Sequence, residues 1–242
     1  MIKFFRHIRR ALLSENKFSK YLIYAFGEII LVVIGILIAL QINTWNELQK
    51  NKTKEKAILS SIHEEFTRNK IQFDSVLAHH KKSYKACEKL INRFPITVRN
   101  ENLDSLGLDL TIALDGWTFN PSQGTINGLI NSSSLDLISD NELREILVSW
   151  PDLILDLQED ENIAKDVIDN FLDPYLSNHL DFNMFLKDPR VNLEVFETLK
   201  FEYLIQLRYN YLKVLFTPGQ ELETTQKHLD RILQLTATKN DD

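Results

Sequence analysis

The apolar residues of this 242-residue chain follow two kinds of pattern, one continuous and one periodic. The continuous one lies in YLIYAFGEIILVVIGILIALQ, where residues 29–40 are apolar or glycine and Glu28 is the one carboxylate. About 20 apolar residues cross the hydrocarbon core of a bilayer. Residues 21–45 therefore predict a transmembrane helix. Three aromatic residues stand near its ends, where amphipathic rings favour the interface: Tyr21, Tyr24 and Trp45.

A cleaved signal peptide is the main alternative for an apolar segment near the N-terminus. Its apolar region usually covers about 7–15 residues and ends at a small-x-small cleavage site. The run here is longer, and the LQINTW sequence at its end offers no such site. We therefore expect an uncleaved signal anchor.

Basic residues beside the span predict its orientation. Six precede it and four follow it closely, a bias that favours a cytoplasmic N-terminus. We expect a single-pass protein of a bacterial inner membrane, with its main domain in the periplasm. The basic residues are Lys3, Arg6, Arg9, Arg10, Lys17 and Lys20 before the span, and Lys50, Lys52, Lys54 and Lys56 after it.

Residues 1–20 are interpreted as a basic amphipathic cytoplasmic segment. Its MIKFFRHIRRALL sequence mixes large apolar and basic side chains, which suits a helix lying on an anionic leaflet. A plain positive flank with partial helix explains the same residues, and both interpretations stay open.

The periodic pattern begins after the span. Over residues 58–94 apolar positions recur every three or four residues without Gly or Pro, which predicts a long helix with a narrow apolar stripe. Because residues 46–56 contain no helix breaker, this helix is expected to continue from the span and to reach about 70 Å over residues 46–94. The stripe comprises Ile58, Ile62, Phe66, Asn69, Phe73, Val76 or Leu77, His80, Tyr84, Cys87, Leu90 or Ile91, and Phe94.

Shorter helices are predicted beyond Pro95. One covers residues 103–114, and a second, inside a turn-rich stretch, runs from 122 to about 131. A capping pattern at Ser139-x-x-Glu142, or Asp140 itself, opens a third helix.

One proline lies within the third helix, and another lies in the break before the last helix. Pro151 is expected to kink or restart that helix, which ends near residues 173–174. A further helix over 193–216 precedes a break at Thr217-Pro218-Gly219 and a last helix. One side of the 193–216 helix is expected to carry Phe196, Leu199, Tyr203, Leu207, Tyr211 and Val214.

The fold class that these elements indicate is all-α, with one N-terminal transmembrane helix and an elongated extramembrane helical bundle. Only 7 Gly and 6 Pro are present, too few for a many-stranded sandwich or propeller, and one cysteine allows no intramolecular disulfide. The expected domains are residues 1–20, the span at 21–45, a helical domain at 46–236 and a disordered tail at 237–242.

Charge is divided unevenly along the chain, whose net charge is -6. Residues 46–100 carry 12 basic and 6 acidic side chains, whereas residues 101–242 carry 10 and 26. A basic first helix therefore suits acidic partner helices in the same domain. The acidic balance argues against binding to nucleic acid.

The N-terminal residues also carry a resemblance. The run FFRHIRRALLSENKFSKYLIYAFGEIILVVIGILIALQINTW resembles an uncharacterised Bacteroidota family of single-span membrane proteins that carries a domain of unknown function. The likeness is close over residues 1–46 and looser over FNPSQGTINGLI…LDLISDNELR. The resemblance implies a location and an architecture, but no activity.

Glu28 is the sharpest single candidate, because a carboxylate within a span is costly. Glu28, Gly35 and Ala39 share one helical face, and Gly35-x-x-x-Ala39 is a small-xxx-small contact. Three roles stay open for Glu28: a headgroup position, a helix–helix interface, or proton coupling as in stator and transport-energising proteins.

A polar, aromatic, turn-rich segment is the candidate site outside the membrane. It is either a ligand or partner loop, or a helix connection whose Asn and Ser side chains satisfy backbone groups. The residues proposed for such a loop are Trp117, Phe119, Asn120, Gln123, Asn127 and Asn131.

Other reactive side chains favour ordinary structural roles. His63, His79 and His80 lack the spacing of a zinc motif, and we expect no metal and no cofactor. The acids at 152–161 are interpreted as a solvated helix face, and Cys87 as a buried thiol. Without a recognised catalytic motif, the chain is not expected to be an enzyme.

We therefore expect a membrane-anchored, non-enzymatic interaction or scaffold protein, oligomeric through its span and the basal helix after it. The partners expected are membrane lipids and either a second copy or another membrane protein. A periplasmic sensory subunit and an ion-coupled accessory subunit built on Glu28 are the alternatives.

Overall fold

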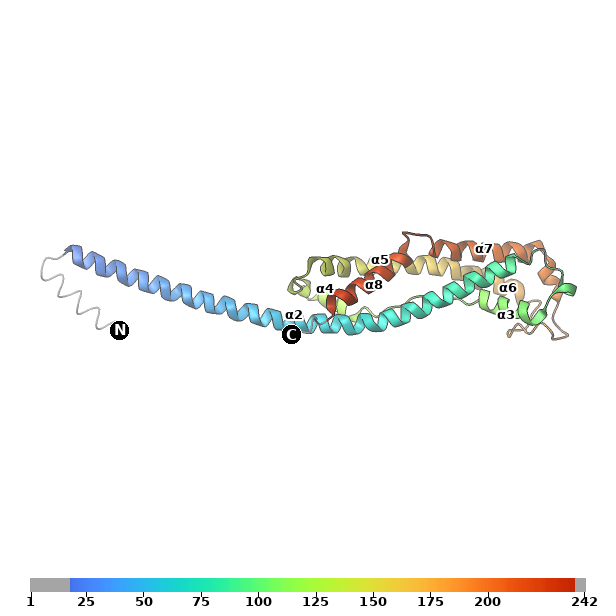
Figure 1. The fold of residues 1–242 in the computed structure, drawn as a ribbon, viewed down its shortest axis with the longest axis horizontal. Helices are drawn as coiled ribbons and strands as arrows, with labels where there is room; N and C mark the ends of the chain where they lie inside the picture. Colours follow the sequence, from blue (N-terminus) through green and yellow to red (C-terminus); the bar gives the residue numbers. More distant parts are fainter. Residues whose placement is uncertain (1–17, 238–242) are drawn as a thin grey trace. The chain divides into compact units, whose positions relative to one another are not determined.

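The computed structural model of the chain describes residues 18–237, apart from the side chains of residues 18–21 and 24. Over this range it contains helices and no strand, which confirms the all-α fold class (Figure 1). The chain divides into two compact units, Met1–Lys56 and Ala57–Asp242. The predictions for residues 1–17, for the rings of Tyr21 and Tyr24, and for residues 238–242 lie outside the described residues.

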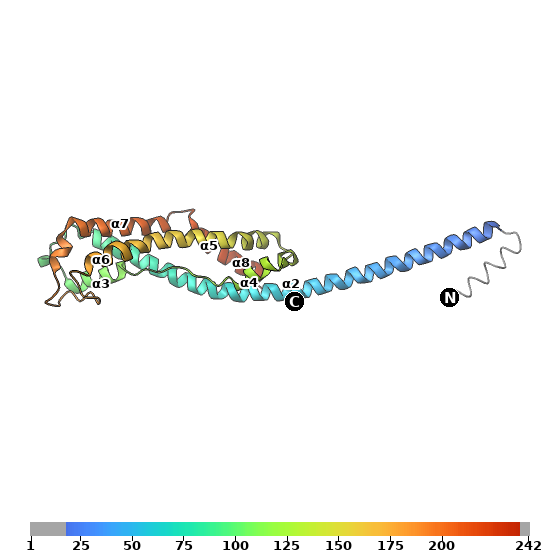
Figure 2. The same cartoon turned by 180° about the vertical axis from the view of Figure 1, so that it is seen from behind.

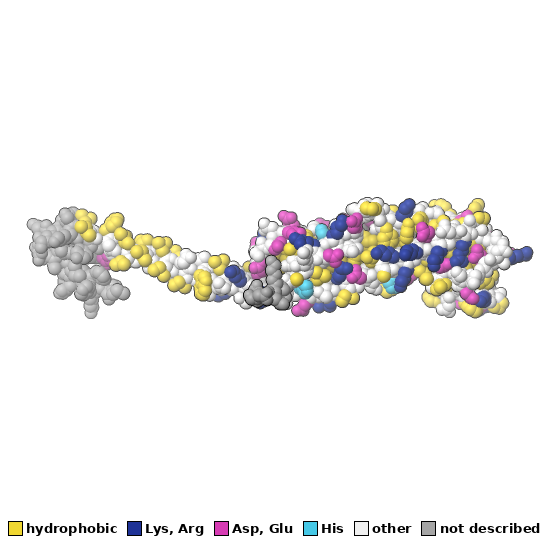
Figure 3. Space-filling view, in the orientation of Figure 1, with side chains coloured by type: hydrophobic (Ala, Val, Ile, Leu, Met, Phe, Trp, Pro, Cys, Tyr) yellow, Lys and Arg dark blue, Asp and Glu magenta, His cyan; other side chains and the backbone are white. Residues whose placement is uncertain are grey.

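Helix α2 (Phe18–Ile91) begins in the first unit and ends in the second, so the helix does continue from the predicted span. Within the first unit its large apolar side chains, from Ile29 to Trp45, are exposed. Among the described residues this is the one helix long and apolar enough to cross a membrane. Figure 3 shows hydrophobic side chains covering this part of the helix, while charged side chains gather over the second unit.

In the second unit, α2 turns its predicted stripe into the core. Phe66 and Phe73 are fully buried, and the Phe66 ring meets Trp150 edge-on, with ring centroids 4.9 Å apart. Asn69 and His80, the polar members of the stripe, are buried as well. The helix ends at Ile91, shortly before Pro95, as a proline that follows a helix favours.

The other helices of the second unit follow in chain order, with three short 3₁₀ segments between them. The α-helices are α3 (Leu103–Ala113), α4 (Gly124–Asn131), α5 (Asn141–Val167), α6 (Asp173–Leu176), α7 (Leu199–Leu215) and α8 (Glu221–Thr236). The 3₁₀ segments are η1 (Val98–Asn100), η2 (Ser134–Leu137) and η4 (Leu193–Glu197), and a π-helical turn, η3 (Ile168–Leu172), joins α5 to α6.

Polar side chains begin three of these helices. Asn102 accepts hydrogen bonds from the backbone at the start of α3, Asp140 accepts one from Leu143 N at the start of α5, and Thr198 accepts one from Phe201 N at the start of α7. Each cap satisfies an N–H group that lacks a partner within the helix. Of the two capping residues expected for α5, Asp140 is the one at the N-cap position.

The core lies between α2 and the later helices. Helix α5 packs against both α7 and α8, and the three lie side by side in the two opposite views (Figures 1 and 2). Leu147, Trp150, Ile154 and Leu157 of α5 are buried with the α2 stripe. Within the second unit, the long helix therefore packs against later helices of its own chain.

Two expectations about α5 concern prolines: a kink or a restart at Pro151, and an end near residues 173–174. The helix passes through Pro151 without restarting, because packing against α7 and α8 compensates for the hydrogen bond that a proline cannot donate. It does not end at residues 173–174 either. The π-helical turn carries the chain into α6, where Pro174 occupies the first turn, a position that needs no N–H donor.

The apolar side expected for the last long helix is the outer side of α7. The 193–216 segment breaks at Thr198 into η4 and α7, and in α7 the expected stripe is exposed except for the half-buried Leu207. Leu199 is 83% exposed and Tyr203 65%. The buried face instead carries Phe201, Leu204, Ile205, Arg208, Leu212 and Leu215. Because α7 has apolar residues on most of its circumference, periodicity alone did not choose between the two faces.

Candidate functional site

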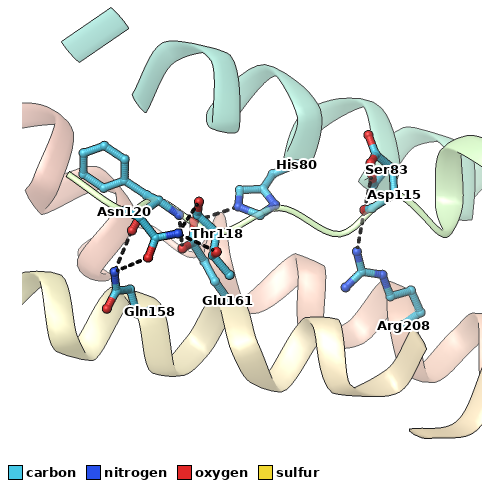
Figure 4. Close-up of polar contacts among 9 residues, drawn as sticks. His80, Ser83, Asp115, Thr118, Asn120, Gln158, Glu161 and Arg208 are labelled. Atoms are coloured by element: carbon cyan, nitrogen blue, oxygen red, sulfur yellow. Dashed lines mark hydrogen bonds and ion pairs between the residues drawn. The ribbon is translucent and has the colours of Figure 1, made fainter. Parts of the chain in front are cut away.

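An extended segment between α3 and α4, residues 114–123, crosses the second unit between α2 and α5 (Figure 4). We call it the strap. It contains four of the six residues predicted for a ligand or partner loop and overlaps the turn-rich stretch of the sequence. A chain without regular structure leaves its backbone N–H and C=O groups unpaired, and burial makes such groups costly. Side chains from α2, α5 and α7 supply the missing partners.

Helix α2 holds the second half of the strap with two polar side chains. Asn69 donates to Ser122 O at 2.8 Å and accepts from Ser122 N at 2.9 Å. One turn earlier, Glu65 accepts from the backbone N–H of Thr125 at 3.0 Å and from its hydroxyl at 2.9 Å. Glu65 therefore binds the beginning of α4, where a carboxylate is also favoured by the helix dipole.

Between them, α2 and α5 hold the middle of the strap through a buried His–Glu pair (Figure 4). His80 Nε2 lies 2.8 Å from Glu161 Oε1, and the two residues are 2% and 1% exposed. The other oxygen, Glu161 Oε2, accepts from Phe119 N at 2.7 Å. One residue pair thus joins α2, the strap and α5, and the Phe119 ring that it positions is fully buried against Phe73.

Gln158 completes this part of the network from α5. Its side-chain amide donates to Phe119 O at 2.8 Å and to Asn120 Oδ1 at 3.1 Å. The N–H and C=O of Phe119 are therefore both bonded by α5 side chains, those of Glu161 and Gln158. Such reciprocal bonding is typical of a segment held in one conformation.

Arg208 of α7 holds the first part of the strap. It is 1% exposed and donates to three carbonyl oxygens, those of Ala113, Ala164 and Asp115. Ser83 of α2 donates to the same Asp115 oxygen at 3.1 Å. Burial lowers the pKa of Arg208 to about 10, so the guanidinium keeps its charge at neutral pH. One buried cation thereby joins the end of α3, the strap, α5 and α7.

The exposed edge of the strap is an aromatic and charged contact. The rings of Trp117 and His79 stack with centroids 4.0 Å apart. Both rings also bond the Asp115 carboxylate: Trp117 Nε1 donates to Oδ1 at 2.7 Å, and His79 Nδ1 lies 2.7 Å from Oδ2. Trp117 is 40% exposed, so this cluster reaches solvent while the His80 pair does not.

The six predicted loop residues are not gathered at one place. Trp117 stacks on His79, Phe119 is in the core, and Asn120 bonds Gln158 and its neighbour Thr118. Gln123 stands half-buried at the N-cap of α4. Asn127 and Asn131 are exposed on that helix. The network is carried by the backbone of the strap and by side chains from other helices.

Sequence reasoning missed Glu161 and Arg208, although one signal for the network was present. Asn69 and His80 stand on the apolar stripe of α2, and a polar group on a buried stripe needs a partner. Glu161 had been assigned to a solvated acidic face, which was wrong: Asp152, Asp156 and Glu159 are exposed, but Glu161 is buried. Its partners lie 81 and 42 residues away, so spacing did not reveal them.

The predicted membrane face lies on helix α2 within the first unit. Glu28, Gly35 and Ala39 are separated by seven and four residues of continuous helix, so they share one side of it. A side chain at Gly35 would meet nothing within 4 Å, and Ala39 is exposed. This side of the helix therefore has room for a close helix–helix contact.

The remaining reactive residues have separate positions. His63 Nδ1 lies 3.0 Å from the hydroxyl of Thr236, far along α2 from the His80 pair. Cys87 is fully buried on the stripe, as expected, and burial raises the pKa of its thiol to about 12. Among the described residues, no three His, Cys, Asp or Glu side chains are grouped closely enough to hold a metal ion.

A second feature of this unit is an apolar surface on α5, η3 and α7. Ile163, Phe171, Tyr203, Leu207 and Tyr211 line a shallow groove between these elements, with Asp166 at its edge. Phe171 is 52% exposed, and Leu199 and Val214 extend the apolar surface along α7. We call these residues the α5–α7 face. Contiguous exposed apolar side chains on a folded domain are typical of an interaction surface.

The contacts of the strap suit a structural role better than a catalytic one. A His–Glu pair is a common source of a general base, but both members are buried and their described hydrogen bonds join parts of the same domain. The α5–α7 face, in contrast, has no described partner that covers it. Binding is therefore better supported at that face than at the strap.

Comparisons with known proteins give a family but no activity. Searches of curated proteins and of solved structures found no significant match. The family model of DUF6090, described as a family of unknown function, matches residues 28–150. The match begins at Glu28, covers the rest of α2, the strap and α4, and ends at Trp150 within α5. With half of its residues in that match, the chain belongs to the DUF6090 family.

Proposed function

We propose that this protein is a membrane-anchored, non-enzymatic interaction protein that associates with a second copy of itself. The observation that carries the proposal is the α5–α7 face. Its aromatic and aliphatic side chains are of the kinds enriched in protein interfaces. A helix that is apolar on its outer side, in a domain whose core is already filled, gains from a partner that covers it.

The charged residues beside the α5–α7 face favour a second copy of the chain as its partner. Asp166 of α5 lines the groove, Lys213 of α7 precedes Val214 of the face in the sequence, and both side chains are exposed. Two copies related by a two-fold axis present the same patch to each other, so the acid of one chain can pair with the lysine of the other. The stripe of α2 is used within its own chain, which leaves the α5–α7 face and the span for contacts between copies.

We place the anchor in a bacterial inner membrane, with a cytoplasmic N-terminus and the helical domain in the periplasm. The six basic residues before the span against four after it support this orientation. The bacterial and Bacteroidota assignment rests on the resemblance of residues 1–46. Within the membrane, the Glu28, Gly35 and Ala39 side of α2 is the proposed contact between spans.

Crosslinking in native membranes, followed by mass spectrometry, tests this function. We expect links between copies at lysines that border the face, above all Lys213 and Lys200. The double variant Tyr203→Asp/Val214→Asp should lose these links, since it places charges on the apolar surface. Leu108→Asp is the matched control, because Leu108 is 61% exposed on α3 and lies outside the face.

Three results would overturn the proposal: links only to a different membrane protein, links between copies that the double variant retains, or equal losses in the control. The span is tested separately with Glu28→Gln. Loss of the assembly would assign Glu28 to helix packing, whereas loss of cellular function with the assembly unchanged would favour an ion-coupled subunit instead.

A further inference from the structure

Four lysines surround helix α2 directly after its apolar part. Lys50, Lys52, Lys54 and Lys56 fall within seven consecutive residues, and all four are exposed. We call them the lysine collar. Two carboxylates accompany them: Glu47, which pairs with Lys50 at 3.3 Å, and Glu55. That ion pair is more than half exposed on both sides, so it removes little of the positive charge.

The distribution of the collar around the helix indicates the shape of its partner. At about 100° per residue, Lys50 and Lys54 lie within roughly 40° of each other, and Lys52 and Lys56 do the same on the opposite side. A protein or a nucleic acid duplex approaches a helix from one side and meets one pair. A layer through which the helix passes meets both pairs at once.

The collar begins at the height of such a layer and extends beyond it. Lys50 and Lys56 stand about 7 Å and 16 Å beyond Trp45 along the helix axis, at 1.5 Å per residue. The headgroup region of a bilayer adds roughly 5–8 Å to each side of the hydrocarbon core. Lysine side chains extend back along a helix towards polar groups, so the ammonium groups of Lys50 and Lys52 can enter that region when Trp45 stands at its inner edge. Those of Lys54 and Lys56 then stand beyond it, within a Debye length of about 8–10 Å, where they still attract anionic headgroups.

Polar residues around Trp45 and at the start of the collar suit the same layer. Asn43, Asn46, Gln49 and Asn51 are exposed amides, which bond phosphate and ester oxygens as well as water. The hydroxyls of Thr44 and Thr53 instead bond their own helix, at Leu40 O and Gln49 O. The helix thus changes from an apolar surface to amides and then to cations.

We propose that the lysine collar binds the phosphate groups of anionic lipid headgroups and so selects anionic lipids around the span. This inference rests on the proposed membrane anchor. The collar lies on the side of the span that carries the helical domain, so it selects lipids of that leaflet. Juxtamembrane lysines attract anionic headgroups by charge, without a fixed binding pocket.

The test uses the full chain in nanodiscs of phosphatidylcholine and phosphatidylglycerol at 70:30. The lipids that remain bound after mild detergent extraction are counted by mass spectrometry. We expect the wild type to retain phosphatidylglycerol at roughly twice its share of the mixture, and 0.5 M NaCl to abolish the enrichment. The collar variant Lys50→Gln/Lys52→Gln/Lys54→Gln/Lys56→Gln should retain the two lipids in proportion.

The control removes the same charge elsewhere. Lys81, Lys82, Lys85 and Lys227 are exposed in the second unit, and replacing all four with Gln should leave the enrichment unchanged. Glutamine and lysine have similar helix propensities, so neither variant disturbs α2 or α8 by that route. Circular dichroism of both variants checks this point.

The outcomes distinguish a failure of the lysine collar from a failure of the membrane anchor on which it rests. Failure of the chain to enter nanodiscs would overturn the membrane anchor. Insertion without enrichment, or enrichment that the collar variant keeps, would overturn the lysine collar alone. Loss of the enrichment in 20 mM sodium phosphate at constant ionic strength would assign the collar to soluble phosphate.

Discussion

Helices α2 and α7 of the second unit both carry large apolar side chains, yet they bury different shares of them. Helix α2 turns Phe66, Phe73 and the rest of one narrow stripe into the core and leaves charged residues outside. Helix α7 buries one apolar face and leaves a second, with Leu199 and Tyr203, in solvent. A helix with a narrow apolar stripe can bury the whole stripe in the core. A helix with a broad apolar surface buries only part of it and leaves the rest exposed for another partner.

The inward faces differ in their polar members too. Helix α2 offers an amide, an imidazole and a carboxylate, from Asn69, His80 and Glu65, whereas α7 offers one cation, Arg208. Asn69 and Arg208 bond the backbone of the strap, His80 bonds the Glu161 carboxylate that positions it, and Glu65 bonds the beginning of α4, directly after the strap. The domain thus uses buried polar groups to hold an irregular segment, and apolar groups to hold its helices together.

The largest expected effect contrasts the two helices directly. Phe66→Ala on α2 removes a fully buried ring and should lower the free energy of unfolding of the second unit by about 3–5 kcal/mol. Tyr203→Ala on α7 should change it by no more than about 0.5 kcal/mol at low protein concentration, because the ring is exposed. Hydrogen exchange of the full chain in nanodiscs measures both. Similar losses would contradict the assignment of Tyr203 to the outer face.

Arg208→Met gives the next largest effect. Methionine keeps the packing of the stem but leaves the three carbonyl groups without their charged donor, for a loss of about 2–3 kcal/mol. Protection from hydrogen exchange should fall first in the strap. Lys213→Met, at an exposed position of the same helix, is the control and should be nearly neutral. An unchanged strap in Arg208→Met would show that the guanidinium does not hold it.

A chemical probe tests the inner side of α2. Cys87 is the one cysteine of the chain, and burial raises the pKa of its thiol to about 12. Below that pH the thiol stays protonated, and only the thiolate reacts readily. Alkylation by iodoacetamide at pH 8 should be at least about 100-fold slower than in denaturant, by whole-protein mass. Rapid labelling of the folded chain would place Cys87 outside the core.

The smallest expected effect is a dependence on pH from α8. Burial lowers the pKa of His228 below its ordinary value near 6.5. The unfolded chain therefore takes up the proton first, so the contribution is complete above about pH 6.5 and is lost as pH falls towards the folded pKa. The thermal midpoint should drop slightly less for His228→Gln than for the wild type between pH 7.5 and 5.5. An equal drop would remove His228 from the pH response.

Much of the fold was predictable because each helix carries local signals. The stripe of α2 has period 3.6, Asp140 begins α5, and Pro95 follows the end of α2 within a few residues. The site was predictable only in part. The turn-rich stretch and the polar positions Asn69 and His80 indicated where it lies, but not the side chains that complete it.

The sequence by itself determined the apolar segment at residues 29–40, the helical class, the stripe of α2 and the burial of Cys87. Each depends on neighbours within a few turns, where spacing translates directly into position. Only the tertiary structure decided which face of α7 is buried, and that Glu161 and Arg208 hold the strap. These depend on contacts between residues 42 to 95 positions apart, chosen by packing and by the need to pair buried backbone groups.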